Sequence, residues 1–292
     1  MSATITNPAS QSTLIERLAE MIGTGRSIGE IADRLGMTRQ KLYGLRRKHG
    51  LLNRQPADQA VTREPASPSV VIGTPPARWR PRRLREIVCQ DQIVAILSAY
   101  AADPTPAAFL LTGETGTGKT AAAHALATEL GCDVTANPPE FGGVHSIASG
   151  EQTADTVREI TDRLHLMPLA GSGWKILIVN EADRISPAAE TVWLDRLESL
   201  PSRTTIVFTT NFPERLSQRL RDRMTTLHTV SDARQLRTRA TGWLRSLARR
   251  EGRTLSNADA GELLDAATVN GQLSLRRASG ALAARLAVRA CA

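Results

Sequence analysis

Two kinds of hydrophobic pattern divide the chain from Trp79 onward. Up to about residue 228, short apolar runs alternate with segments of helical periodicity, and the clearest runs are Ala107–Thr112, residues 176–179 and Thr204–Thr210. Such runs are typical of parallel strands that are buried on both faces. From about Thr229 the periodicity is helical to the end. The pattern predicts an α/β domain over residues 79–228, with a parallel sheet flanked by helices, and a helical domain over residues 229–292.

The first 53 residues show only helical patterns. Ser27 and Glu30 form a capping box at the start of one helix, and Thr38 caps the next helix after a short turn at Gly36. This arrangement resembles a helix-turn-helix. Its second helix exposes groups suited to base edges and phosphates: Arg39, Gln40, Lys41, Tyr43, Arg46, Arg47 and Lys48. We expect residues 1–53 to be an all-α module that binds double-stranded DNA, and a protein-docking module with a charged face is the alternative.

Composition and charge add a linker and a basic N-terminal third. Residues 54–78 are rich in Pro, Ala, Ser and Thr, which is typical of a flexible linker. Residues 1–85 hold 15 Lys and Arg against 6 Asp and Glu, a net charge of +9, whereas the remainder holds 22 against 23, a net charge of −1. The excess charge suggests a polyanionic partner for the first third, and a solvated basic tail is the alternative.

The cysteines and the apolar runs exclude several classes of protein. Cys89, Cys132 and Cys291 are isolated, which argues against a disulfide framework and against a cysteine-rich zinc site. No apolar run approaches the roughly 20 residues that cross a bilayer, and the N-terminus lacks a signal-peptide pattern. We therefore expect a cytoplasmic protein without a membrane partner.

A phosphate-binding loop follows the first apolar run. Ala107–Thr112 leads into a segment that matches the P-loop pattern at every fixed position, and a helical pattern over residues 121–130 comes next. Backbone N–H groups of such a loop approach the phosphates, the lysine reaches the β- and γ-phosphates, and the last hydroxyl binds Mg²⁺. The sequence therefore predicts ATP and Mg²⁺ as cofactors, bound by Gly113, Glu114, Thr115, Gly116, Thr117, Gly118, Lys119 and Thr120.

The second apolar run has the form of a Walker B strand. It ends at Asn180 and Glu181, and Glu181 is a candidate general base that polarises the attacking water. Asn180 stands where the usual metal-side Asp is found, and it keeps one oxygen ligand without the charge. We therefore expect Thr120 and Asn180 to face the metal, and we expect hydrolysis to be slow. Asp183 is interpreted as the N-cap of a following helix.

The third apolar run, Thr204–Thr210, is followed by Asn211. A polar side chain at that strand end is placed to orient the lytic water, as sensor 1 of AAA+ proteins does. The alternative is an Asn that only opens a turn before Phe212 and Pro213.

At this point the chain resembles the clamp-loader branch of the AAA+ ATPases, over about residues 78–290. Trp79, Arg80 and Pro81, followed by Leu84, Ile87, Val88, Gln90, Ile93 and Val94, look like the adenine-side segment of clamp-loader small subunits. The resemblance implies that Trp79, Arg80 and Pro81 contact the nucleotide. It also implies that Arg223 is an arginine finger toward a neighbouring subunit, and that Arg276, on a helix capped by Ser274, contacts the γ-phosphate in its own subunit.

The chain departs from that family in five respects. Cys89 replaces a Gly, Asn180 replaces the Walker B Asp, and the zinc-binding cysteines of bacterial motor subunits are absent. We also expect no helical collar domain after the lid, and the helix-turn-helix is an addition.

The sequence as a whole predicts a DNA-associated AAA+ ATPase with four parts: a helix-turn-helix (1–53), a linker (54–78), a P-loop core (79–228) and a helical lid (229–292). ATP is expected at an interface in a homo- or hetero-oligomer during DNA replication or repair, with a replication clamp or a transposase as partner. The alternatives are a transposition or helicase-loading regulator of a mobile element, and an ATP-gated DNA-binding switch with little hydrolysis.

Overall fold

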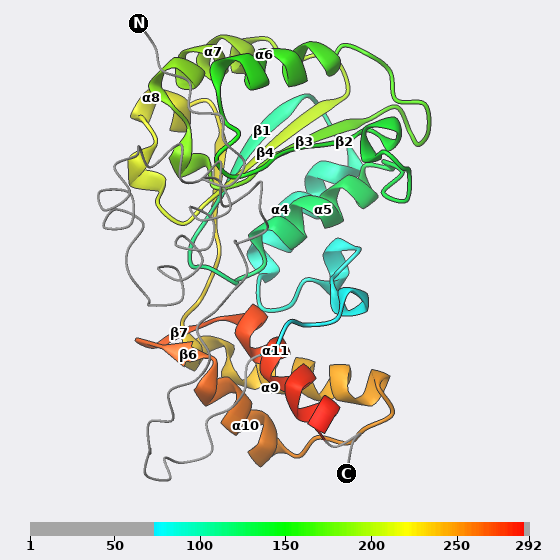
Figure 1. Ribbon diagram of the computed structural model, residues 1–292, viewed down its shortest axis with the longest axis vertical. Coiled ribbons are helices and arrows are strands. Elements are labelled where there is room, and N and C mark those ends of the chain that lie inside the picture. Colours follow the sequence, from blue (N-terminus) through cyan, green and yellow to red (C-terminus); the bar gives the residue numbers. More distant parts are fainter. Residues whose placement is uncertain (1–72, 289–292) are drawn as a thin grey trace, which may run out of the picture. The chain divides into compact units, whose positions relative to one another are not determined.

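The computed structural model describes residues 73–288, and a parallel sheet forms the centre of its α/β part (Figure 1). The strands are β1 (Ala107–Thr112), β2 (Val144–Ile147), β3 (Lys175–Val179), β4 (Thr204–Thr210) and β5 (Thr225–His228), in the order β2-β3-β4-β1-β5. Every neighbouring pair is parallel. The three predicted strands are confirmed, and the α/β P-loop fold with them, although β2 and β5 did not stand out in the hydrophobic pattern.

Helices cover both faces of this sheet (Figure 1). Helices α4 (Asp91–Ala102) and α5 (Lys119–Glu129) pack on one face, and α6 (Ala154–Arg163) and α7 (Pro187–Glu198) on the other. Alternate residues of β3 enter the two clusters, since Ile176 and Ile178 lie in the first while Leu177 and Val179 lie in the second. Both side-chain directions of the central strands are therefore buried, which explains their continuous apolar runs.

The part after β5 has its own apolar cluster, built by α9 (Ala233–Arg250), α10 (Asn257–Ala266) and α11 (Leu275–Val288). The prediction of an all-helical lid was wrong at one place, because β6 (Thr268–Val269) and β7 (Gln272–Leu273) form a short antiparallel hairpin. Asn270 and Gly271 in its turn have φ values of 51° and 76°. An Asn-Gly pair is the strongest short-range signal for a two-residue hairpin turn, so the sequence did contain the evidence.

The segment before α4 joins the lid to the sheet. Trp79 and Cys89 pack into the lid cluster, whereas Leu84 and Ile87 pack into the cluster of α4 and α5. The segment contains two short 3₁₀ helices, η2 (Ala77–Trp79) and η3 (Leu84–Glu86). The backbone N–H of Gly73 donates to the Gly280 carbonyl at 3.2 Å, so residues 73–78, which were expected to be linker, lie against the lid.

This placement changes how the basic residues are distributed. Five of the 15 Lys and Arg counted in residues 1–85 are Arg78, Arg80, Arg82, Arg83 and Arg85, and they belong to the segment between lid and sheet. Residues 1–77 hold the other 10, against 6 acidic residues, which leaves a net charge of +4. About half of the charge assigned to the N-terminal third thus lies beside the ATPase core. The predicted helix-turn-helix, with Arg39 to Lys48, and residues 54–72 of the linker lie outside the described residues.

Between residues 73 and 288, no helix combines the length and the apolar character that crossing a membrane requires.

Candidate nucleotide-binding site

The P-loop lies between the end of β1 and the start of α5. Gly113, Gly116 and Gly118 have φ values of 125°, 83° and 106°, which are costly for residues with a Cβ. A Cβ on Gly113 would lie 2.2 Å from Thr229 Oγ1, and one on Gly116 would lie 2.1 Å from Ser274 Oγ. Helix α5 starts at Lys119, two residues earlier than predicted, so its first N–H groups open onto the loop. This is the geometry of a phosphate cradle.

Lys119 is held inside the loop by polar atoms. Its Nζ donates to the carbonyls of Gly113 and Glu114 at 2.6 and 2.8 Å, and to Asn211 Oδ1 at 2.8 Å. The residue is 8% exposed, and this burial, as the largest cause, lowers the pKa of its ammonium to about 8. Glu114 and Asp183 oppose that pKa shift, whereas the charge of Arg276 adds to it. Among residues 73–288 no carboxylate forms an ion pair with Lys119, and a bound phosphate would supply an anion at close range.

The two residues predicted to face a metal lie together. Thr120 Oγ1 donates to Asn180 Oδ1 at 3.2 Å. Neighbouring ligand oxygens of an octahedral Mg²⁺ lie about 2.9 Å apart, because each is about 2.0–2.1 Å from the metal. The oxygen pair therefore fits a small hard cation, and phosphate oxygens and water would complete the set.

Asn211 bridges the end of β4 and the P-loop. Its Oδ1 accepts from Lys119, and its Nδ2 donates to Thr115 Oγ1 at 2.8 Å. The parallel pairing of β4 with β1 brings this strand end beside the loop. Asn211 therefore does more than open a turn.

Glu181 lies at the mouth of the site in a left-handed backbone conformation, with φ of 51°. Its side chain is 51% exposed. It accepts a hydrogen bond from Ser149 and pairs with Arg184 at 3.2 Å. Gln152 Nε2 donates to the backbone carbonyls of Asn180 and Glu181, so the loop after β2 supports this corner.

Asp183 does not cap a helix, so that interpretation was wrong. It lies inside the 3₁₀ turn η5 (Ala182–Arg184), with its side chain only 7% exposed, and it accepts from Thr210 Oγ1 at 2.7 Å. The N-cap of α7 is Ser186, whose side chain accepts from the Ala189 N–H. The local sequence allowed either residue, and the neighbouring strand β4 supplied the partner for Asp183.

The start of α11 closes the other side of the P-loop. The Arg276 N–H donates to the Gly116 carbonyl at 3.2 Å, and Ser274 Oγ accepts from the Arg277 N–H, as expected of a cap. The Arg276 side chain is exposed and is close enough to Lys119 to affect its pKa. The structure thus brings the lid and the P-loop together at this residue.

Arg223 lies apart from this group. Its guanidinium pairs with Glu198 at the end of α7 and donates to the Arg219 carbonyl at 3.0 Å. Neither of these partners, both within residues 73–288, belongs to the P-loop.

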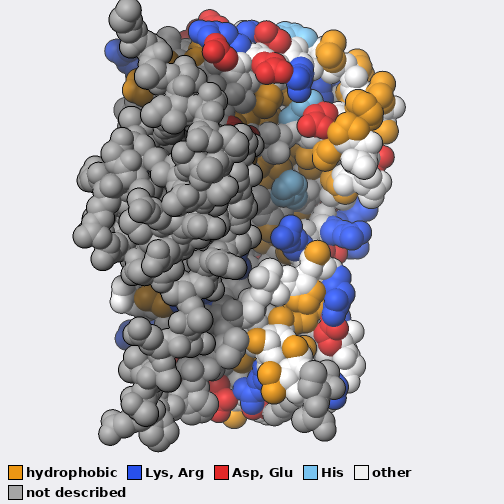
Figure 2. Space-filling model, viewed as in Figure 1, with side chains coloured by type: hydrophobic (Ala, Val, Ile, Leu, Met, Phe, Trp, Pro, Cys, Tyr) orange, Lys and Arg blue, Asp and Glu red, His pale blue; other side chains and the backbone are white. Residues whose placement is uncertain are grey.

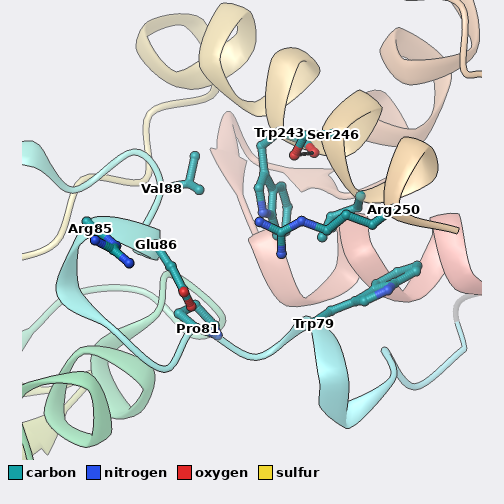
Figure 3. Close-up of a pocket in the computed structure, with 9 residues that line it drawn as sticks. Trp79, Pro81, Arg85, Glu86, Val88, Trp243, Ser246 and Arg250 are labelled. Atoms are coloured by element: carbon teal, nitrogen blue, oxygen red, sulfur yellow. Dashed lines mark hydrogen bonds between the residues drawn. The ribbon is translucent and has the colours of Figure 1, made fainter. Parts of the chain in front are cut away.

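Two of the three predicted adenine-side residues lie around a cavity of about 400 Å³ (Figure 3). Trp79 and Pro81 line it, and Trp243 and Arg250 project from α9 on the opposite wall (Figure 3). The Trp79 ring is 7% exposed and its Nε1 donates to Glu251 Oε1 at 2.7 Å, so most of the ring is already committed to the lid. Arg80 is close enough to His124 on α5 to help burial lower the pKa of that histidine. Figure 2 shows Lys and Arg side chains beside a histidine on the described part of the face in view.

The sequence did not identify as functional two residues whose hydrogen bonds hold the P-loop in place, Gln90 and Thr229. Gln90, 3% exposed, exchanges two hydrogen bonds with the backbone of Val230, at 2.8 and 2.9 Å, and also reaches the Thr117 carbonyl. Thr229 Oγ1 bonds to Thr117 Oγ1 and the Thr112 carbonyl. Gln90 lies in the segment that resembles clamp-loader small subunits, so the sequence contained a sign of its importance. No sequence feature pointed to Thr229.

Comparison with known proteins identifies the class of this domain. Residues 109–231 match the model of the AAA family, the ATPase family associated with various cellular activities. With the parallel sheet and the P-loop in place, the chain carries an AAA domain.

Its relatives belong to the clamp-loader clade, which confirms the predicted resemblance. A replication factor C small subunit of Methanoculleus marisnigri is 33% identical over 148 residues, covering 50% of this chain and 44% of the relative. A replication factor C small subunit of Thermofilum pendens is 29% identical over 217 residues, covering 72% and 62%. DNA polymerase III subunit gamma/tau of Mycobacterium bovis is 31% identical over 164 residues, covering 50% and 28%. The chain thus spans between about a quarter and two thirds of the length of these relatives.

Solved structures of Thermotoga maritima RuvB, one of them described as a Holliday junction branch migration motor, share the fold. That structure is 21% identical, with a TM-score of 0.52, and the match covers 72% of this chain and 64% of RuvB.

Proposed function

We propose that this protein binds Mg²⁺-ATP at the P-loop and hydrolyses it. The observation that carries the proposal is the convergence of three separate elements, β3, β4 and α11, on one loop. The strand ends of β3 and β4 bring Asn180 and Asn211 to Thr120 and Lys119, and α11 brings Arg276 to Gly116. Side chains from distant parts of the sequence meet at the place where a nucleotide phosphate would lie.

Each residue then has a stated role. Backbone N–H groups of residues 113–118 and Lys119 bind the phosphates, and Thr120 and Asn180 would hold Mg²⁺, which neutralises phosphate charge. Glu181 accepts the proton of the attacking water, Asn211 orients that water, and Arg276 stabilises the γ-phosphate. Trp79, Arg80 and Pro81 bound the base side. Glu181 must release Ser149 and Arg184 to act, and Asn180 lacks the charge of an aspartate, so turnover is expected to be slow.

The proposed process is DNA replication or repair, with ATP at a subunit interface as in a clamp loader. This proposal is supported by the relatives, which are named as replication factor C and DNA polymerase III subunits. The alternatives are a regulatory ATPase of a mobile element and an ATP-gated switch. Binding to a replication clamp would favour the clamp-loader role, and binding to a transposase would favour the mobile-element regulator. A very low rate of ATP turnover would favour the switch over both.

Two single variants, Lys119→Ala and Asn180→Asp, test the ATPase activity. Lys119→Ala should abolish ATP binding measured by calorimetry while the thermal unfolding transition persists. Asn180→Asp should raise turnover at limiting Mg²⁺, because a carboxylate binds the cation more tightly than an amide. Equal ATP affinity in Lys119→Ala and the parent would refute the proposal.

The N-terminal module is proposed to bind double-stranded DNA through Arg39, Gln40, Lys41, Tyr43, Arg46, Arg47 and Lys48. In the full chain, Arg46→Ala with Arg47→Ala should weaken binding to a duplex. The slope of log affinity against log salt should become shallower by about 0.9 for each phosphate that the variant no longer neutralises. Arg82→Ala with Arg85→Ala is the control for basic residues of the described segment. If only that control pair changes the slope, the module is a protein-docking domain instead.

A further inference from the structure

The turn after β4 is held by the Thr210 hydroxyl, which donates one hydrogen bond and accepts another. Thr210 is 1% exposed, and its Oγ1 donates to Asp183 Oδ1 at 2.7 Å. The same oxygen accepts from the Phe212 N–H at 3.0 Å. The two bonds are attached on either side of Asn211, so they restrict the backbone that carries it.

Asp183 anchors the same turn a second time. Arg215 Nη1 lies 3.9 Å from Asp183 Oδ2, and the Arg215 guanidinium lies 4.4 Å from the centre of the Phe212 ring. An ionised carboxylate only accepts hydrogen bonds, so Thr210 must be the donor toward Asp183. Its lone pairs are then left to face the Phe212 N–H, and the direction of both bonds is defined.

The side chain between these anchors is the one that reaches the P-loop. Asn211 accepts from Lys119 and donates to Thr115, both at 2.8 Å. A rotation of the turn would move both bonds, because both start from one planar amide.

We propose that Asp183 and Thr210 are positioning residues, which hold the turn so that the Asn211 amide faces the phosphate end of the P-loop. The proposal rests on the ATP hydrolysis proposed above, but the geometry that it asserts is present without nucleotide. Neither residue is proposed to touch the nucleotide. Thr210 acts through the position of Asn211, and Asp183 acts through Thr210 in addition to the effect of its charge on Lys119.

The chain offers a matched pair of substitutions. Thr210→Val removes the hydroxyl that bonds to Asp183, and Thr209→Val removes the hydroxyl of the preceding residue, also buried, for which the structure of residues 73–288 shows no side-chain hydrogen bond. Thr210→Val should lower ATP turnover roughly tenfold, since small misplacements of a catalytic group cost one to two orders of magnitude. ADP affinity should change less than about twofold. Thr209→Val should leave both near the parent values.

Three further variants separate positioning from general damage. Thr210→Ser keeps the hydroxyl and Asp183→Asn keeps an acceptor oxygen, so both should retain most of the turnover, whereas Asp183→Ala should behave like Thr210→Val. In an Asn211→Ala background, Thr210→Val should cause no further loss, because the side chain that it positions is gone.

A spectroscopic measurement makes the test independent of turnover. The side-chain amide resonances of Asn211 in the nucleotide-free protein should shift toward solvent-exposed values in Thr210→Val and stay in place in Thr209→Val. An unchanged Asn211 amide in Thr210→Val, or an equal loss of turnover in Thr209→Val, would overturn the proposal. If the amide shifts only in Thr210→Val while the parent shows no turnover, positioning stands and the proposed hydrolysis fails.

Discussion

Cys89 shows how one residue can carry a departure from its family. It stands where the clamp-loader pattern has Gly, and its φ is 67°, a left-handed conformation that costs other residues about 1–2 kcal/mol. Its side chain is 5% exposed in the lid cluster, and burial raises the pKa of its thiol to about 11. The thiol is therefore a neutral packing group in a strained backbone position.

We predict that Cys89→Gly is more stable than Cys89→Ala by about 1 kcal/mol, because both lose the thiol but only glycine tolerates the positive φ. The free energy of unfolding in denaturant measures the difference. Cys132 is the matched control, since it is a buried cysteine that is not among the described residues with positive φ. There the usual order should hold, with Ala more stable than Gly. The same order at both positions would contradict the prediction.

At the scale of elements, the contact between α11 and the P-loop is the one that the helical pattern could not foresee. The capping of α11 by Ser274 was predictable from the local sequence, and it is confirmed. The packing of that cap against Gly116 depends on the path of the chain from β5 through α9 and α10 back to the loop (Figure 1). Glycine is therefore required at position 116 for two reasons: the positive φ, and the closeness of Ser274, which leaves no room for a Cβ.

We predict that Gly116→Ala destabilises the protein more than Gly118→Ala does. Both positions have positive φ, but a Cβ at Gly118 meets nothing within 4 Å, whereas one at Gly116 meets Ser274 Oγ at 2.1 Å. Ser274→Gly removes that obstacle and keeps an acceptable N-cap, so it should recover part of the difference. Midpoints of thermal unfolding provide the measurement. No recovery would mean that the lid does not press on this glycine.

At the scale of the whole molecule, Arg223 is the residue whose proposed role needs a second subunit. In the described structure its guanidinium is paired with Glu198, and that pair must open if Arg223 is to reach a neighbour's nucleotide. This role is the one implied by the resemblance to clamp loaders, and the relatives are themselves named as subunits.

We predict that Arg223→Ala binds ATP with an affinity near that of the parent and hydrolyses it at least about tenfold more slowly, as expected for loss of an arginine finger. Mixing it with Lys119→Ala should restore part of the turnover, because each protein supplies the group that the other lacks. Arg219→Ala, in the same short helical region, is the control, and it should hydrolyse ATP near the parent rate without being mixed with a second variant. The absence of rescue in mixtures shown to assemble would remove the trans role.

The amino-acid sequence by itself determined the strands β1, β3 and β4, the P-loop and the polar residues at the strand ends. These features depend on local periodicity and on spacing along a single segment. Only the tertiary structure decided which side chains meet. Asp183 bonds to Thr210, 27 residues away, and Gln90 bonds to Val230, 140 residues away. The physical reason is that pairing in the sheet places segments side by side that are distant in sequence. Asp183 lies just after β3 and Thr210 ends β4, the strand paired with it, and Val230 follows β5, which pairs with β1 beside the P-loop.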